Sequence, residues 1–230
     1  MRLTLIAAAA LLAPSAGLAQ QITAGQVDNF EGGTAANWTQ GALGAPGVVT
    51  GGPTGTADHY IRITASGGFG AGSRLTVLNR VQWTGNYIAA GVTAIEMDLL
   101  NSGSSQLKMR IGFKSGQLQN DPGYSSTTAF DLDADGQWHH AVFPLSAGTM
   151  TAVGSPAAFD TFMTSVAEMR ILHSISPDLN GDTISTVVGV DNIRAVAAPV
   201  PEPTGALAAA AVAAGLAGMF ARRRRVGRVT

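Results

Sequence analysis

Residues 94–114 read AIEMDLLNSGSSQLKMRIGFK, in which two runs of alternating apolar and charged residues flank a short polar segment. Because successive side chains of a β-strand point to opposite faces, each run predicts a strand with one apolar and one charged face. The apolar faces hold Ile95, Met97 and Leu99 in the first run and Leu107, Met109, Ile111 and Phe113 in the second. The charged faces hold Glu96 and Asp98 in the first run and Lys108, Arg110 and Lys114 in the second. We expect an antiparallel hairpin, since it would set carboxylates beside cations, worth roughly 0.2–1 kcal/mol per pair.

Similar strand-like runs recur between glycine-rich turns on both sides of this pair. They occupy residues 59–65, 74–79, 138–145, 168–174 and 185–197. Residues 157–166 could form a short helix. Many short strands without long helices predict an all-β fold, and we expect an antiparallel β-sandwich of the jelly-roll type over residues 20–198.

The composition restricts how this domain is stabilised and what it binds. There is no cysteine among the 230 residues, so packing, alone or with a metal ion, must stabilise the fold in place of disulfides. Of the 14 Lys+Arg, eight lie between Asp28 and Glu202, a stretch that contains all 15 Asp+Glu and therefore carries a formal charge of −7. Nucleic acid is not an expected partner, because phosphates are bound by clustered lysine and arginine.

Residues 1–19 have the layout of a secretory signal peptide. Arg2 precedes the apolar residues 3–13, and the small residues Gly17 and Ala19 stand before Gln20, so we expect cleavage after Ala19. A buried first helix is the alternative, but the run is short and begins at the initiator methionine with a basic flank. The sequence therefore predicts an exported domain.

The carboxyl end carries a second apolar segment. Residues 199–204 are a proline-rich linker, and residues 205–221 are uncharged and would span about 25 Å as a helix, the short end of what crosses a bilayer. A cationic tail at 222–230 follows and should remain on the cytoplasmic side. Its first four residues are Arg222, Arg223, Arg224 and Arg225. We expect residues 205–221 to form a transmembrane helix that anchors the exported domain.

These carboxyl-terminal features together resemble a known sorting signal. The order of Pro201, Glu202 and Pro203, a short apolar span and an arginine cluster is similar to the PEP-CTERM signal of Gram-negative bacteria, over about the last thirty residues. The resemblance implies that an exosortase, a membrane protease or transpeptidase, removes the tail. It further implies passage from the inner membrane to the cell surface or the extracellular matrix. An ordinary single-span anchor is the alternative.

The two ends of the domain resemble the edges of jelly-roll carbohydrate-binding modules and their lectin-like relatives. The stretches are VDNFEGGTAANWTQG at 27–41 and VVGVDNIRAV at 187–196. The resemblance implies a structural calcium ion shared by an acidic residue near the start and an aspartate in the last strand. Carried over by position, Glu31 and Asp191 would be ligands, with Asp28 a further candidate. The alternative is that Asp28 and Asp191, each followed by asparagine, lie in polar turns and bind nothing.

Two other acidic stretches have turn-like sequences. DLDADG fills positions one, three, five and six of a calcium loop with Asp131, Asp133, Asp135 and Gly136. Its twelfth position is Val142, where a bidentate glutamate belongs, so a turn leading into the next strand is favoured and calcium is the weaker alternative. The stretch DLNGD at 178–182 contains Asn180-Gly181 and is interpreted as a turn.

An enzymatic function has weak support in the sequence. The nearest resemblance is to jelly-roll glycoside hydrolases of the laminarinase type, whose strand carries two glutamates around an aspartate. Glu96 and Asp98 fit part of this pattern, but Leu100 and Asn101 stand where the second glutamate belongs. The sequence therefore favours a non-catalytic domain, with a glycoside hydrolase as the less favoured alternative.

A non-catalytic surface domain would either bind extracellular polysaccharide or have a purely structural role. The candidates for stacking against sugar rings are Trp38, Tyr60, Trp83, Tyr87 and Trp138. Aromatic residues make up only 6% of the chain and some must fill the core, where we expect Trp138 because it lies beside a strand start. The sequence leaves both functions open.

Overall fold

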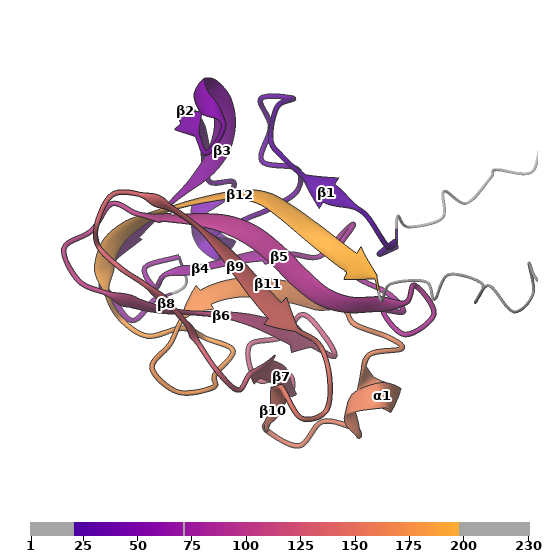
Figure 1. Cartoon of the computed structure of the whole chain (residues 1–230). Helices are drawn as coiled ribbons and strands as arrows, with labels where there is room; N and C mark the ends of the chain where they lie inside the picture. Colours follow the sequence, from indigo (N-terminus) through magenta and orange to yellow (C-terminus); the bar gives the residue numbers. More distant parts are fainter. Residues whose placement is uncertain (1–20, 71, 198–230) are drawn as a thin grey trace, which may run out of the picture. The chain divides into compact units, whose positions relative to one another are not determined.

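The computed structural model describes residues 21–70 and 72–197, which form two antiparallel sheets of six strands each (Figure 1). Sheet A has the strand order β2-β3-β12-β5-β9, and β1 also pairs with β12. Its strands are β1 (Val27–Asp28), β2 (Gly47–Gly52), β3 (Gly55–Ser66), β5 (Val92–Asn101), β9 (Trp138–Pro144) and β12 (Ser185–Ala197). The predicted all-β antiparallel fold is confirmed.

Sheet B has the strand order β10-β7-β6-β11-β4, and β8 also pairs with β6. Its strands are β4 (Thr76–Asn79), β6 (Leu107–Lys114), β7 (Gly123–Ser126), β8 (Phe130–Leu132), β10 (Met150–Val153) and β11 (Glu168–His173). A short 3-10 helix occupies Gly41–Leu43, and α1 (Phe159–Phe162) lies inside the segment expected to form a short helix. The runs at 107–114 and 185–197 have the bounds that the sequence predicted.

The expected hairpin over residues 94–114 is wrong. β5 pairs with β12 and β9 in sheet A, whereas β6 pairs with β11, β7 and β8 in sheet B. Residues 102–106 therefore pass from one sheet to the other, and the two apolar faces meet across the core. The alternation of residues is the same in both arrangements, so it could not separate them. As a consequence, the two charged faces lie on opposite outer surfaces of the sandwich and do not pair.

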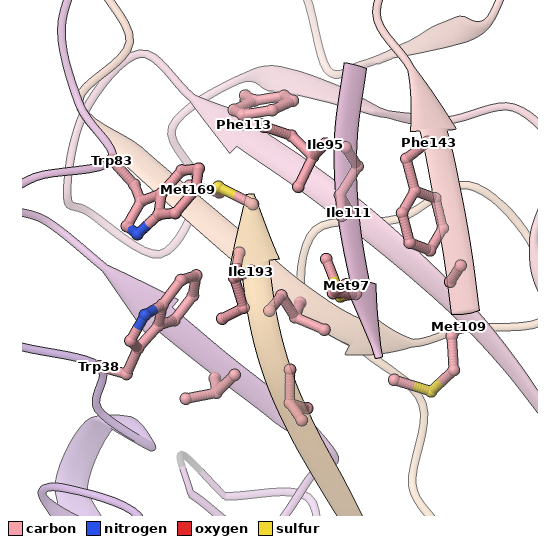
Figure 2. Packing of buried hydrophobic residues seen from close by; sticks show 14 of the residues in the cluster. Trp38, Trp83, Ile95, Met97, Met109, Ile111, Phe113, Phe143, Met169 and Ile193 are labelled. Carbon is pink, nitrogen blue, oxygen red and sulfur yellow. The ribbon is translucent and has the colours of Figure 1, made fainter. Parts of the chain in front are cut away.

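The core lies between the sheets. Each apolar side chain of β5 and β6 named above is at most 1% exposed, and Figure 2 shows several of them packed against one another. Full burial of such a side chain contributes roughly 1.5–3 kcal/mol to folding. Trp38 and Trp83 pack together, with ring centroids 6.1 Å apart, and Tyr87 is also fully buried. Three of the five aromatic candidates for sugar stacking are therefore core residues.

β12 has an irregularity near the middle of sheet A. Its register with β5 shifts between Asp191 and Arg194, and Asn192 adopts a left-handed conformation with φ +50°. A β-bulge of this kind changes the direction in which neighbouring side chains point. Asp191, directly before this shift, lies opposite Asp98 of β5 and therefore shares the outer face of sheet A with it.

The expectations for both ends of the chain lie outside the described residues. They are the signal peptide at 1–19, the linker at 199–204 with its sorting motif, the transmembrane helix at 205–221 and the tail at 222–230. Within 21–70 and 72–197, no helix is both long and apolar enough to cross a membrane. The four expectations stay predictions.

Candidate functional site

The outer face of sheet B, turned away from the core, collects most of the cations of the domain. Six of the eight Lys+Arg between Asp28 and Glu202 lie on this sheet or directly beside its strands. They are Arg74, Arg80, Lys108, Arg110, Lys114 and Arg170. Because β6 and β11 pair antiparallel, Arg170 lies opposite Gly112, and Glu168 lies opposite Lys114. Cations from distant parts of the sequence thus share one surface.

Residues 174–184, here called the cover segment, lie across part of this face. Arg110 donates hydrogen bonds to the carbonyl oxygens of Ser174, at 2.9 Å, and Ile175, at 3.0 Å. The side chain of Leu179 fills the space above Gly112, where a Cβ atom would lie only 2.8 Å from the Leu179 Cδ2 atom. Glycine within β6 therefore leaves room for the cover segment.

An open pocket of about 300 Å³ lies beside the cover segment. It is bounded by the loop before β4, the loop after β6, and the turn of the cover segment. Its polar lining residues are Gln40, Arg74, Thr76, Arg80, Gln117, Gln119, Arg170 and Asn180. Phe69, also in the lining, is 83% exposed. The pocket thus combines amide and guanidinium groups with an accessible aromatic ring.

Glu168 connects two arginines of the pocket. It is fully buried and accepts hydrogen bonds from the Nε atoms of both Arg80 and Arg170. Arg80 also donates to the carbonyl oxygen of Gln117 at 3.1 Å, and Arg170 donates to that of Leu179. These contacts position both guanidinium groups, and a single carboxylate is shared between them.

Lys114 experiences the excess of positive charge on this face. Burial and then the charge of Arg170 lower the pKa of Lys114, against the opposing effects of Glu168 and Asp121. Its ammonium group donates to the carbonyl oxygens of Leu118 and Gln119. Lys114 therefore holds the loop after β6 at the edge of the pocket.

A second polar site lies on sheet A around Asp191. This residue is fully buried, and its Oδ1 atom accepts a hydrogen bond from the Asn192 N–H at 2.7 Å. Its Oδ2 atom has no partner among the described residues. Burial raises the pKa of Asp191 to about 7, and the nearby charges of Asp58, Asp98 and Glu31 add to the effect. A buried oxygen without a partner destabilises the fold by about 1–3 kcal/mol. A proton or a cation bound to this atom would therefore be stabilising.

Glu31 and Asp58 lie near Asp191, and their carboxylate groups are suitable ligands for a calcium ion. They line a shallow depression together with Asn29, Thr54 and Asn192. Over residues 21–70 and 72–197, no three acidic, histidine or cysteine side chains come together closely enough to enclose a metal ion. Carboxylate oxygens are nevertheless the ligands that calcium prefers. The unpartnered oxygen of Asp191 fits such an ion, whose charge would offset the repulsion among the three carboxylates.

Asp28, the third calcium candidate, binds core donors. Its Oδ2 atom accepts hydrogen bonds from the indole N–H of Trp38 at 2.7 Å and of Trp83 at 2.6 Å, and from Gln82 Nε2 at 3.0 Å. Figure 2 shows the two indoles side by side. Asp28 is 9% exposed, and three donors satisfy one of its oxygens. Its contacts are those of a structural acceptor.

The aspartates at 131–135 have separate partners. Asp131 pairs with the Lys108 ammonium at 2.7 Å, Asp133 accepts from Gln106 at 2.7 Å, and Asp135 accepts from the Gln137 N–H at 2.9 Å. Asp135 also contacts His139, and Gly136 has φ +67°. This is the arrangement of a turn that leads into β9. The stretch at 178–182 is likewise a turn, as predicted, with Gly181 at φ +72°.

Tyr60 and Trp138 form an aromatic pair on the outer face of sheet A. Their ring centroids are 5.0 Å apart in an edge-to-face arrangement, and both residues are half-buried. They lie above Gly189 of β12, where a Cβ atom would come within 2.9 Å of each ring. The expectation that Trp138 belongs to the core is therefore wrong, because this position of β9 faces outward.

The carboxylates on the outer face of β5 lie beside a histidine, whereas the sequence predicted that they would lie beside a cationic strand. The His140 Nδ1 atom lies 2.9 Å from Asp98, and its Nε2 atom lies 3.9 Å from Glu96. Asn192 also donates to Asp98 at 2.8 Å. His139 contacts Asp135, so the two adjacent histidines face different surroundings. Glu96 and Asp98 thus form a half-exposed polar cluster on sheet A.

Comparison with known proteins identifies the fold. No protein-family model matches the sequence, and no curated protein matches it significantly. An exo-β-agarase matches with a TM-score of 0.52 and 13% sequence identity. This match covers 76% of this chain and 25% of the agarase chain. A family 11 carbohydrate-binding module from Clostridium thermocellum, described in complex with a β-1,3-1,4-mixed-linked tetrasaccharide, has a TM-score of 0.46 and 14% identity. That match covers 76% of this chain and 97% of the module. At 13% identity, the match to part of the agarase chain shows a shared fold and nothing further.

Sequence reasoning did not find the pocket or Asp58. Arg74 and Arg80 are about ninety residues from Arg170, and the pairing of β4 with β11 brings them together. Phe69 was not among the aromatic candidates, although it is the most exposed large hydrophobic side chain of the described residues. Asp58 lies near the start of β3 in no recognisable motif. Only the strand pairing, which the sequence did not determine, joins these residues.

Proposed function

We propose that this chain is an exported, non-catalytic polysaccharide-binding protein whose binding site is the pocket on the outer face of sheet B. The pocket is the observation that carries the proposal. Amide and guanidinium groups donate hydrogen bonds to neighbouring sugar hydroxyls in a geometrically defined way, and an exposed ring such as Phe69 can stack on a sugar face. The fold, shared with part of an exo-β-agarase, is consistent with this function.

The distribution of carboxylates favours binding over hydrolysis. Glycoside hydrolysis requires two carboxyl groups at about 5–9.5 Å that flank the scissile bond. Among the described residues, those that line the pocket include no carboxylate. Glu96 and Asp98, the only pair that resembles a hydrolase motif, lie on sheet A with His140. We therefore assign no catalytic residue.

The proposed location follows from the two ends of the sequence. A signal peptide at 1–19 would start export, and an exosortase would recognise Pro201, Glu202 and Pro203 ahead of the membrane span at 205–221. Processing would release the domain to the cell surface or to extracellular polymer, where polysaccharide is present. Fractionation of cells that make the full chain, against cells that make a chain lacking 199–230, tests this step. Surface delivery of both forms would contradict it.

We include a structural calcium ion in the proposal. Asp191 would supply its unpartnered Oδ2 atom, and Glu31 and Asp58, which do not enclose an ion together with Asp191 in the described arrangement, would move closer to complete the site. The residues themselves come from the loop after β1, from β3 and from β12, so a shared ion would tie three parts of sheet A together. Asp28 is not part of this set because its carboxylate accepts from the indoles.

A polysaccharide array probed with the purified full-length chain, in calcium and in chelator, tests the function. We expect binding to one class of polysaccharide, and weaker binding by Gln119→Ala, which changes an exposed residue of the pocket lining. Gln137→Ala is the matched control, since Gln137 is equally exposed on the turn before β9. If no polysaccharide binds in either condition, the function is wrong and a purely structural surface protein is the better description.

A further inference from the structure

The pocket on sheet B differs in charge from the domain that contains it. Its described lining residues include three arginines, Arg74, Arg80 and Arg170, and no carboxylate. The stretch from Asp28 to Glu202 has a formal charge of −7. Three of its eight cations therefore gather around one cavity of a strongly acidic domain.

Glu168 does not neutralise this cavity. It is fully buried, and its single negative charge is shared by the guanidinium groups of Arg80 and Arg170. The side chain of Arg170 is only 9% exposed, while that of Arg80 is 37% exposed. The lowered pKa of Lys114 next to this group has burial and then Arg170 as its main causes, which is consistent with an excess of positive charge.

Two of the arginines retain hydrogen-bond donors that the described contacts do not use. A guanidinium group has five N–H donors. Arg74 uses one nitrogen, Nη1, to reach the Gly181 carbonyl oxygen at 2.8 Å. Arg80 uses Nε and Nη2, for Glu168 and for the carbonyl oxygen of Gln117. Among contacts between described residues, Arg74 Nε and Nη2 and Arg80 Nη1 have no partner, so both groups can bind an anion without breaking these contacts.

The acidic remainder of the domain does not prevent anion binding at this place. At physiological ionic strength the screening length is about 8 Å, so exposed carboxylates on the far sheet have little influence on the pocket. Charges lining the cavity are screened less, because protein surrounds them on several sides. Local charge, not net charge, decides which ligand is attracted.

We propose that the pocket binds an acidic saccharide, one that bears a carboxylate or a sulfate ester, and that Arg74 and Arg80 pair with its anionic group. Guanidinium groups suit both anions because they donate two parallel hydrogen bonds. The amides of Gln117, Gln119 and Asn180 would bind the sugar hydroxyls beside the anion. This inference rests on the proposed polysaccharide-binding function and names the class of sugar.

Titration calorimetry on the purified full-length chain tests the inference with defined oligosaccharides. The carboxylate arm uses oligogalacturonate, the sulfate arm uses κ-carrageenan oligosaccharides, and the neutral arm uses agarose and mixed-linkage β-glucan oligosaccharides. Polyglutamate serves as an acidic polymer without sugar. We expect at least roughly tenfold tighter binding to one acidic saccharide than to the neutral set, and loss of affinity as salt rises from about 50 mM to about 200 mM.

Arg74→Gln should weaken binding of that saccharide roughly tenfold. Arg62→Gln should leave the affinity unchanged, because Arg62 is exposed on sheet A although the change in net charge is the same. Melting curves establish that each variant is folded, and the salt dependence of the unmodified chain tests the inference without any variant. Equal or tighter binding of neutral saccharides, or equal binding of polyglutamate, would overturn the acidic class. Absence of binding to every saccharide would instead overturn the proposed function.

Discussion

The outer faces of the two sheets differ in their charge and in what lies over them. Sheet A carries the carboxylates of β5, the fully buried Asp191 with its unpartnered Oδ2 atom, and the aromatic pair of Tyr60 and Trp138. Sheet B carries the arginines, and the cover segment lies over part of it with Leu179 packed above Gly112. The strands of sheet A thus carry more carboxylates than cations, of which they have Arg62 and Arg194, whereas sheet B gathers arginines beside an open pocket. This difference suggests a metal on one face and a ligand on the other.

The largest expected effect comes from the buried ion pair of sheet B. Glu168→Ala leaves Arg170, which is 9% exposed in its side chain, without its carboxylate, and should lower the free energy of unfolding by about 3–5 kcal/mol. The matched change on sheet A, Glu96→Ala, removes a side chain that is 29% exposed and should cost about 1 kcal/mol or less. Urea denaturation measures both. Equal losses would show that the two faces do not differ in this way.

Calcium should act on sheet A. An ion held by Glu31, Asp58 and Asp191 should raise the free energy of unfolding by about 2.7 kcal/mol at one hundred times its dissociation constant. Asp191→Asn should abolish the calcium-dependent rise in melting temperature. Asp133→Asn should retain it, since Asp133 already accepts from Gln106 in the turn before β9. If Asp133→Asn alone removed the response, the ion would belong to the loop at 131–136.

Alanine substitutions of the glycines beneath the two outer faces should also differ in how much they lower the stability. Gly112→Ala places a Cβ atom 2.8 Å from Leu179 Cδ2 and should cost about 1–3 kcal/mol while it loosens the cover segment. Gly189→Ala meets the rings of Trp138 and Tyr60 at 2.9 Å, but these half-buried rings can shift toward solvent, so the cost should be smaller. Thermal melting gives the two costs. Amide exchange should become faster in residues 174–184 for Gly112→Ala only, and unchanged exchange there would argue against the packing role.

The smallest effect is a dependence on pH at the start of the cover segment. Burial lowers the pKa of His173, as does the charge of Arg110, against the opposing charge of Asp182, and the Lys108 N–H donates to Nδ1 at 3.0 Å. The folded state therefore keeps this imidazole neutral, and its contribution to stability is present above about pH 6.5 and is lost as the pH falls through the lowered pKa. His173→Asn, measured by urea denaturation in chelator, should lose less stability than the unmodified chain between neutral and acidic pH. Parallel curves would contradict this assignment.

The sequence predicted the strands well and their partners poorly. The period-two pattern of residues 107–114 gave the bounds of β6, because alternation and the surrounding turn residues act locally. The same pattern is satisfied whether β5 and β6 pair directly or face each other across the core, so the predicted hairpin was wrong. Strand pairing depends on contacts between distant residues, which one sequence does not display.

The residues of the candidate sites were likewise predicted only in part from the sequence. Glu31 and Asp191 were predicted as calcium ligands through a family resemblance, and the structure places Asp58, near the start of β3, close to Asp191. Asp28 shared their sequence context, yet its carboxylate accepts from two tryptophans. The pocket had no signal in the sequence, since Arg74 and Arg170 meet only after β4 pairs with β11.

Affinity electrophoresis in gels that contain the polysaccharide selected by the array distinguishes the two faces most directly. The comparison is between Phe69→Ala, at the pocket of sheet B, and Trp138→Ala, on the outer face of sheet A, with melting curves to establish that both are folded. Binding at sheet B predicts that Phe69→Ala migrates almost as in a gel without polysaccharide, while Trp138→Ala is retarded like the unmodified chain. Loss of retardation in Trp138→Ala, with Phe69→Ala unaffected, would place the ligand on sheet A and contradict the proposal.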